Sequence, residues 1–176
     1  MKRNDILSAA KEIAYEKGIS NVNIRLVAQK SNVSIGTIYN YYETKSDLII
    51  AIVEDFWNKA FKTIDIIVLE NIDFYDKIQT IYEKLYVYVN QFKENWIKKL
   101  AHLTQNEKKG GKEIEKQYLI KIVCMISSII EQEKKINILE REKVAILIVD
   151  NMLASLRKNK NDFTFFIEVL KKYLSD

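Results

Sequence analysis

The stretch of sequence that decides the fold is residues 23–45, which read NIRLVAQKSNVSIGTIYNYYETK. Asn23 can cap a short helix from residue 24 to about residue 30, and Ser34 can cap a second from residue 35 to about residue 41. Serine and asparagine also fill the segment between the two helices, where their side chains can bond the local backbone of a turn. Two short helices joined by a tight turn are the shape of a helix-turn-helix motif, whose second helix enters the major groove of DNA.

Around this stretch the sequence predicts an all-α fold. The 176 residues include no proline and only four glycines, 48% are hydrophobic, and the apolar residues recur at helical spacing. We expect about nine helices, with a surface loop at 107–112 as the clearest break in the chain. The expected helices span about residues 2–17, 24–30, 35–41, 45–69, 74–95, 96–106, 113–135, 140–157 and 162–173.

The expected domain boundary lies inside the long helix that begins near residue 45, because no flexible linker is visible. Residues 1–48 are predicted to form the helix-turn-helix DNA-binding domain, with the motif at about 24–43, and residues 49–176 a helical regulatory and dimerisation domain. The net charge is +4. Residues 1–48 carry seven Lys/Arg and five Asp/Glu, which gives +2, and the other 128 residues carry twenty-one and nineteen, which also gives +2. Positive charge is therefore denser at the N-terminal end, which permits a nucleic-acid partner without requiring one.

Composition argues against an enzyme and against a membrane protein. With one cysteine and one histidine, no disulfide, zinc cluster or Ser–His–Asp set can be built, so no metal, cofactor or catalytic residue is expected. The longest apolar stretch, residues 119–130, is broken by Lys121 and is shorter than the roughly 20 residues that span a bilayer. No apolar signal segment follows the N-terminus, so we expect a cytoplasmic protein with no membrane partner. The apolar neighbours of Cys124 predict a buried and unreactive thiol.

The helix expected at 140–157 is apolar nearly all round, so it must be covered on more than one side. One possibility is that it lies at the centre of a monomer. We favour a second subunit as part of the cover, with the helix at 162–173 completing the interface of a homodimer. The predicted interface residues are Ile148, Met152, Phe166 and Leu170.

The exposed positions of the second motif helix carry side chains that suit DNA. Gly36 allows a close approach, and Thr37 can contact a phosphate or the methyl group of thymine. Asn40 can pair with adenine or bond a phosphate. The hydroxyl groups of Tyr39 and Tyr41 suit phosphate oxygens.

Two cations flank this helix and are expected to contact the phosphate backbone. Arg25 lies at the start of the preceding helix and Lys45 at the start of the following one, where free N–H groups also favour phosphate. Ser34 stands where the second motif helix begins. The alternative interpretation is that two short polar helices form a structural corner in a helical protein of any function.

The identity and order of the residues narrow these alternatives. The runs I-x-x-V-A from residue 24, N-V-S-x-G-T-I-Y-x-Y-Y from residue 32 and K-S-D-L-I from residue 45 resemble the N-terminal domain of the tetracycline-repressor (TetR) family of bacterial transcription regulators. The resemblance covers about residues 3–50, and no subfamily is evident beyond them. By position it implies DNA contacts at Arg25, Thr37, Tyr39, Tyr41 and Lys45, with Ser34 and Gly36 at the start of the helix.

Two positions depart from the family's pattern. Asn23 stands where Thr is usual, which exchanges one helix-capping oxygen for another. Tyr42 stands where Phe is common, so its hydroxyl group needs a partner or a position at the edge of the core.

The resemblance implies a repressor that binds a pseudo-palindromic operator as a homodimer and is released by a small-molecule effector. Aromatic side chains in the body offer apolar faces with polar tips, which suits an apolar or aromatic effector. Three alternatives stay open: these side chains form core, the body binds a protein partner instead, or the head is a relic on an enzyme or interaction module. The candidate effector-binding residues are Phe61, Tyr82, Tyr86, Trp96, His102 and Met125.

Overall fold

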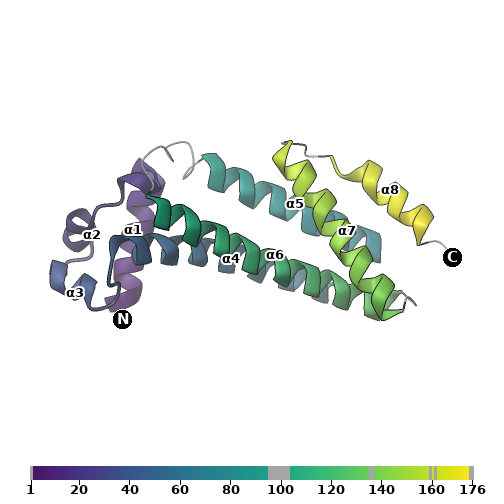
Figure 1. The fold of residues 1–176 in the computed structure, drawn as a ribbon, viewed down its shortest axis with the longest axis horizontal. Helices are drawn as coiled ribbons and strands as arrows, with labels where there is room; N and C mark the ends of the chain where they lie inside the picture. Colours follow the sequence, from purple (N-terminus) through teal and green to yellow (C-terminus); the bar gives the residue numbers. More distant parts are fainter. Residues whose placement is uncertain (1, 95–103, 135–136, 159, 161, 175–176) are drawn as a thin grey trace. The chain divides into compact units, whose positions relative to one another are not determined.

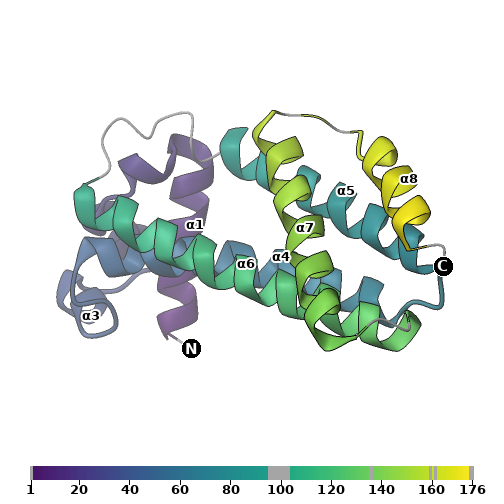
Figure 2. The same ribbon diagram turned by 45° about the vertical axis from the view of Figure 1, so that its right-hand side comes forward.

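The computed structural model describes residues 2–94, 104–134, 137–158, 160 and 162–174, and every regular element in them is helical (Figures 1 and 2). The prediction of an all-α fold is therefore confirmed. Within these residues no helix combines the length and the apolarity needed to cross a bilayer. The elements are α1 (Lys2–Lys17), the 3-10 helix η1 (Ile19–Asn21), α2 (Ile24–Lys30), α3 (Ile35–Tyr39), α4 (Lys45–Leu69), α5 (Phe74–Phe92), α6 (Gln105–Glu133), α7 (Ile138–Arg157) and α8 (Thr164–Tyr173).

The chain forms two compact units, each of which takes residues from two separate parts of the sequence. The first unit contains Met1–Asn58 and Asn90–Glu115, and the second contains Lys59–Val89 and Lys116–Asp176. The unit that holds the motif therefore also includes the beginning of α6. A functional boundary at residue 48 stays a prediction.

The first unit is organised by one apolar stripe on α1, which packs beside α2. Ile6, Ala10, Ile13 and Ala14 recur at helical spacing and are all buried. Gly18 ends the helix with a φ of 86°, a left-handed value that favours glycine, and its N–H donates to the carbonyl of Ala14 at 2.8 Å. Other buried side chains of this core are Val27, Ala28, Ile38, Leu48 and Ile52.

The beginning of α6 differs from the prediction. The loop expected at 107–112 is wrong, because α6 runs without a break from Gln105 to Glu133. Thr104 and Glu107 cap it reciprocally: the Thr104 N–H donates to Glu107 Oε2 at 2.7 Å, and the Glu107 N–H donates to Thr104 Oγ1 at 3.3 Å. This capping box satisfies free donors at the helix start. The helix expected at 96–106 falls mostly on residues outside the described ones.

Two adjacent glycines lie inside α6, where each costs about 1 kcal/mol relative to alanine. A Cβ atom on Gly110 would lie 2.6 Å from Cδ1 of Ile50 on α4, whereas a Cβ on Gly111 would meet no atom within 4 Å. Gly110 therefore permits a close approach between α6 and α4 within the first unit. The packing that this approach allows helps the helix to continue through both glycines.

The second unit has an aromatic and aliphatic core. Tyr82 on α5, Phe74 at the start of the same helix and Phe163 beside α8 are almost completely buried. A partly buried ion pair joins α5 to α6, with Lys77 Nζ 2.5 Å from Glu133 Oε1. The large aliphatic side chains of this core include Ile64, Ile78, Ile81, Ile126 and Ile129.

Cys124 is exposed, so the prediction of a buried thiol is wrong. Ile122 and Ile126 are both buried, and Cys124 lies two residues from each of them on α6. Two residues correspond to about 200° of helix rotation, so the thiol falls on the opposite face. Apolar neighbours in the sequence are therefore no guide to which face of α6 a residue occupies.

Candidate nucleic-acid interface

The two motif helices begin at side-chain caps, as the sequence predicts. Asn23 Oδ1 accepts from the N–H of Arg25 at 2.8 Å, and Ser34 Oγ accepts from the N–H of Thr37 at 3.1 Å. At the start of α4, the N–H of Thr44 donates to Asp47 Oδ2 at 2.8 Å. Each helix of the motif therefore has a fixed first residue, which sets the position of every side chain after it.

The turn between α2 and α3 is closed by backbone and side-chain hydrogen bonds. The N–H and the hydroxyl group of Ser31 both donate to the carbonyl of Val27, at 2.9 and 2.6 Å. Asn32 adopts a φ of 52°, a left-handed value that asparagine tolerates better than most residues. Val33 then donates its N–H to the carbonyl of Ala28 at 3.0 Å. These contacts fix the angle at which α3 leaves α2.

Most of the predicted contact residues on α3 are exposed. Tyr39 and Tyr41 are 46% and 44% exposed, whereas Ile38, just before Tyr39, is completely buried. Gly36 and Asn40 are exposed, and Asn40 forms the C-terminal cap of the helix. The motif thus presents a polar and aromatic surface and is held to the core from behind.

Thr37 is oriented by the residue that caps the helix. Its Oγ1 lies 2.9 Å from Ser34 Oγ, so one hydroxyl group donates to the other. Thr37 is half-buried, and Ser34 is exposed. The hydroxyl group that accepts this bond keeps its own O–H, which can donate to a phosphate at the beginning of α3.

Gly36 has no role in the packing of the protein itself. A Cβ atom added there would lie 3.8 Å from Ser34 Oγ, which is ordinary van der Waals contact. Its φ also lies outside the left-handed region. Neither the packing nor the backbone of the free protein therefore requires a glycine at this exposed position.

The two flanking cations differ in their surroundings. Arg25 is exposed on the first turn of α2. Lys45 is half-buried at the start of α4, and its Nζ donates to the carbonyl of Ser20 at 3.4 Å. Arg25 is thus open to solvent, whereas Lys45 has a long hydrogen bond to exchange before it can contact a phosphate.

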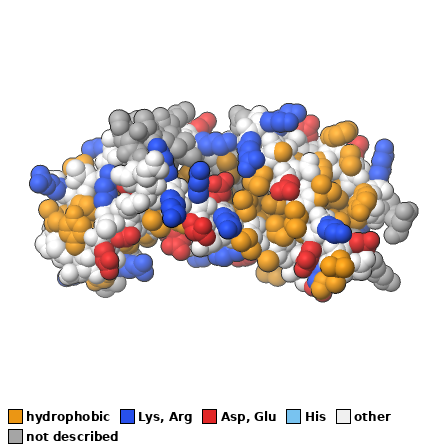
Figure 3. Space-filling view, viewed as in Figure 1, with side chains coloured by type: hydrophobic (Ala, Val, Ile, Leu, Met, Phe, Trp, Pro, Cys, Tyr) orange, Lys and Arg blue, Asp and Glu red, His pale blue; other side chains and the backbone are white. Residues whose placement is uncertain are grey.

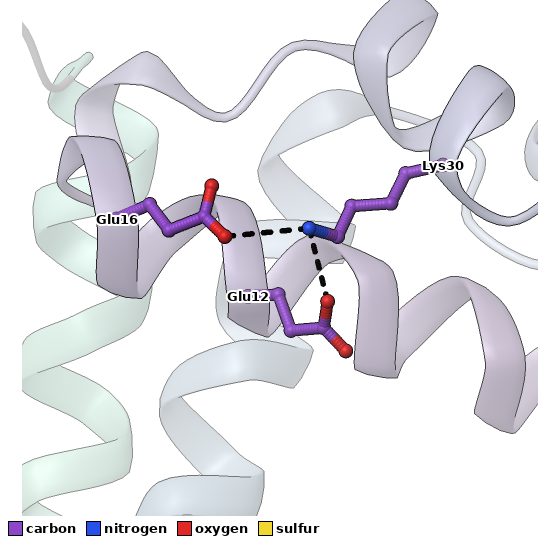
Figure 4. A network of polar contacts seen from close by, with 3 residues as sticks. All are labelled: Glu12, Glu16 and Lys30. Carbon is purple, nitrogen blue, oxygen red and sulfur yellow. Dashed lines mark hydrogen bonds and ion pairs between the residues drawn. The ribbon is translucent and has the colours of Figure 1, made fainter.

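A third cation, Lys30, braces α2 against α1 and was missed by sequence reasoning (Figure 4). Its Nζ lies 3.0 Å from Glu12 Oε2 and 3.4 Å from Glu16 Oε1. The hydrogen bond that Lys30 donates to Glu12 raises the pKa of Lys30. Glu12 and Glu16 are four residues apart and therefore lie on one face of α1, where both carboxylates can contact the same cation.

Tyr42 is buried rather than at the edge of the core, with 3% of its surface exposed. The guanidinium carbon of Arg3 lies 5.7 Å from the centre of its ring. Burial raises the pKa of the phenol group. No described residue makes a well-aligned hydrogen bond to its hydroxyl group, so neither of the two expected arrangements is found.

The candidate effector-binding residues separate into three groups. Phe61 and Tyr82 are buried: the Phe61 ring lies 4.9 Å from that of Tyr118, and the Tyr82 hydroxyl donates to the carbonyl of Lys160. Both side chains are therefore engaged inside the second unit. The remaining candidates are Tyr86 and Met125, which are half-buried, and Trp96 and His102, which lie outside the described residues.

The predicted interface residues lie mostly inside the protomer. Ile148, Met152 and Leu170 are buried in the second unit, and Phe166 is half-buried. The same two helices expose other apolar side chains, and Figure 3 shows orange apolar side chains gathered over α7. These exposed residues are Ile138, Leu139, Ile146 and Leu147 on α7 and Phe165, Val169 and Tyr173 on α8.

Capped helices, a closed turn and an exposed second helix define the helix-turn-helix class of DNA-binding domains. Residues 6–52 match the model of the bacterial regulatory proteins of the tetR family. The N-terminal part of the chain is therefore a tetR-family domain, and the resemblance found in residues 3–50 is confirmed. A search of the curated proteins gave no significant match.

Solved structures of transcriptional regulators share the fold over nearly the whole chain. A regulator from Cytophaga hutchinsonii has a TM-score of 0.68 and 17% identity, over 99% of this chain and 93% of that one. The regulator FadR from Bacillus subtilis, in complex with stearoyl-CoA, has a TM-score of 0.56 and 17% identity, over 89% and 88%. The fatty acid degradation regulator FadR from Bacillus halodurans has a TM-score of 0.58 and 19% identity, over 98% and 97%. The helical body thus has the fold of a transcriptional regulator.

Proposed function

We propose that this protein is a cytoplasmic transcriptional repressor that binds a pseudo-palindromic operator through the exposed face of α3. The observation that carries the proposal is Gly36, an exposed glycine that the free protein does not need. Beside it lie the hydroxyl groups of Thr37, Tyr39 and Tyr41 and the amide of Asn40. A glycine at the start of the helix removes a side chain from the surface that approaches the groove, and its neighbours supply hydrogen bonds to phosphates and base edges.

We further propose that the repressor acts as a homodimer whose interface includes the exposed apolar face of α7 and α8. On α7, Leu139 and Ile146 are seven residues apart and thus lie on one face of the helix. On α8, Phe165, Val169 and Tyr173 follow each other at intervals of four residues. The interface residues predicted from the sequence would then support this face from beneath rather than touch the partner.

Operator selection from randomised DNA duplexes tests both parts of this proposal. The expected result is an inverted repeat, with half-sites separated by about one helical turn, about 34 Å, or a multiple of it. Sedimentation of the complex is expected to give two chains on each duplex. The proposal is contradicted if no inverted repeat is enriched, or if a single chain binds the selected duplex.

The proposed effector is a small apolar or aromatic molecule bound by the helical body. The stearoyl-CoA complex of the Bacillus subtilis regulator makes a long acyl thioester the first compound to test, with free stearate and free CoA as controls. Coupling must be reciprocal: an effector that weakens operator affinity tenfold must itself bind the operator complex tenfold more weakly. Titration of the effector with and without operator measures both factors.

Met125 on α6 offers a matched test of where the effector binds. We expect Met125→Trp to weaken effector binding with no change in operator affinity, because the side chain is half-buried. The control is Cys124→Trp, the same substitution at an exposed neighbour on the same helix. If the two variants bind the effector with equal affinity, this region of α6 is excluded as the effector-binding site.

A body that binds a protein partner is the second candidate. It is favoured by Ile66 and Leu69 near the end of α4, which are 62% and 85% exposed and apolar. Replacement of both by lysine is then expected to abolish regulation while operator affinity and the dimer persist. Normal regulation by that double variant would exclude a partner at this surface.

A further inference from the structure

Tyr82 makes its contacts with the segment that leads from α7 into α8. The side chain is completely buried, and its hydroxyl group donates to the carbonyl oxygen of Lys160. Its ring stacks on that of Phe163, with centroids 4.3 Å apart and an interplanar angle of 17°. Tyr82 of α5 therefore contacts both Lys160 and Phe163, which precede α8 in the chain.

Local contacts at the start of α8 come from Asp162 and Phe163. The helix has only ten residues, and Phe163 at its N-terminal cap provides no side-chain hydrogen bond. The local contacts include the bond from the Thr164 N–H to Asp162 Oδ1 at 2.9 Å and the bond from the Ile167 N–H to the carbonyl of Phe163 at 3.2 Å, and the rings of Phe163 and Phe166 are 4.9 Å apart. A helix of this length is marginal in isolation, so tertiary contacts decide where it lies.

The outer face of α8 is apolar and unusually exposed. Phe165, Val169 and Tyr173 are 79%, 46% and 65% exposed and form one stripe at intervals of four residues. Phe165 lies only two residues after Phe163, whose ring Tyr82 holds. Only Thr164 separates Phe163 from the first residue of the stripe.

We propose that Tyr82 is a positioning residue for self-association, which fixes α8 so that its apolar stripe meets a second copy of this chain. The inference rests on the proposed homodimer. A surface that is already fixed in the free protomer loses less conformational entropy when it binds. The free energy of dimerisation is more favourable by the same amount. Tyr82, a candidate effector residue by sequence, thereby acquires a role at the dimer interface.

The test is the dimer dissociation constant of the full chain, measured by analytical ultracentrifugation. Tyr82→Phe keeps the stacked ring and removes the hydrogen bond to Lys160, so the constant is expected to rise about fivefold. Tyr82→Leu removes both contacts, and a rise of at least about 30-fold is expected. Amide hydrogen exchange in residues 164–173 is expected to accelerate in both variants.

Two control variants separate positioning from a general loss of stability. Tyr88→Phe removes a hydroxyl group of α5 that lies 3.0 Å from Thr63 Oγ1 on α4, and Ile64→Val weakens the buried core at α4. Both are expected to keep the dissociation constant of the original protein. If Tyr82→Phe also keeps it, or if Ile64→Val raises it equally at a matched loss of stability, the role of Tyr82 is refuted. An original chain that stays monomeric at all concentrations refutes the homodimer and this inference together, whereas a dimer with unchanged Tyr82 variants refutes only the inference.

Discussion

The exposed face of α3 and the packed start of α6 use glycine for opposite reasons. At Gly110 an added Cβ would lie 2.6 Å from Ile50, so the glycine serves contact within the protein. At Gly36 an added Cβ would meet only Ser34 Oγ at 3.8 Å, so internal packing leaves the glycine unexplained. Both belong to the first unit and both lie in helices. Gly36, which lies among the polar and aromatic side chains of the proposed DNA-binding face, is therefore open to a role in contact with a partner.

The largest effect of a single substitution is expected from a bulky side chain at Gly36. Gly36→Leu should reduce operator affinity by about 100-fold, because the leucine occupies the surface that approaches the groove. The free energy of unfolding should stay equal or increase by up to about 1 kcal/mol, since leucine is the better helix former. Fluorescence anisotropy with the selected operator and urea unfolding measure the two quantities. Loss of affinity together with loss of stability would instead assign Gly36 an internal role.

The two glycines of α6 offer a matched pair. Gly111→Ala should raise the free energy of unfolding by about 0.5–1 kcal/mol, because the added methyl group meets nothing and the helix gains propensity. Gly110→Ala should gain less or become destabilising, since Ile50 must move to make room. Urea unfolding of both variants checks the difference. An equal gain in both variants would show that the close approach to α4 has no energetic weight.

Tyr42 has a buried hydroxyl group, and its removal tests whether this group stabilises or destabilises the folded protein. Tyr42→Phe should raise the free energy of unfolding by about 1 kcal/mol, because it removes a buried polar atom that has no hydrogen bond among the described residues. The matched variant Tyr82→Phe removes a hydroxyl group that is bonded to Lys160 and should lower stability by a similar amount. Effects of the same sign in the two variants would contradict this account of both phenol groups.

The smallest effect is expected on the free energy of unfolding at alkaline pH. Burial raises the pKa of Tyr42 and of Tyr82 above the ordinary value of 10.0, so the unfolded chain releases these protons first. The stability that they contribute is complete below pH 10.0 and is lost as the pH rises through their folded pKa values. The doubly substituted Tyr42→Phe, Tyr82→Phe variant should therefore lose stability less steeply above pH 10.0 in urea titrations. Identical slopes would mean that neither phenol group is protected in the folded state.

Local contacts explain why the motif could be predicted from the sequence. The caps of Asn23 and Ser34 reach two and three residues along the chain, and both are found as predicted. The capping box of Thr104 and Glu107 is equally local, but it was not predicted. Gly110 and its neighbour have low helix propensity, and this favoured a loop over a helix in the same stretch. The tertiary packing that allows α6 to continue is not visible in the helix propensity of the sequence.

Contacts between distant residues explain what could not be predicted. Tyr82 and Lys160 are 78 residues apart, so nothing in the sequence joins them. The sequence also indicates that the helix at 140–157 is apolar nearly all round, but it does not show which face is buried in the protomer. Ile148 and Met152, which we predicted at the interface, lie inside. Similarly, the side of α6 that carries Cys124 depends on which helices cover it.

The central claim is that α3 presents a DNA-binding surface, and one titration tests it most directly. The operator affinity of the original protein is compared with that of the Thr37→Ala, Tyr39→Ala double variant, with Tyr15→Ala as a control at an exposed tyrosine on α1. We expect at least about a 100-fold loss of operator affinity in the double variant, an unchanged dimer, and no loss in the control. Operator binding by the double variant at the affinity of the original protein would contradict the account.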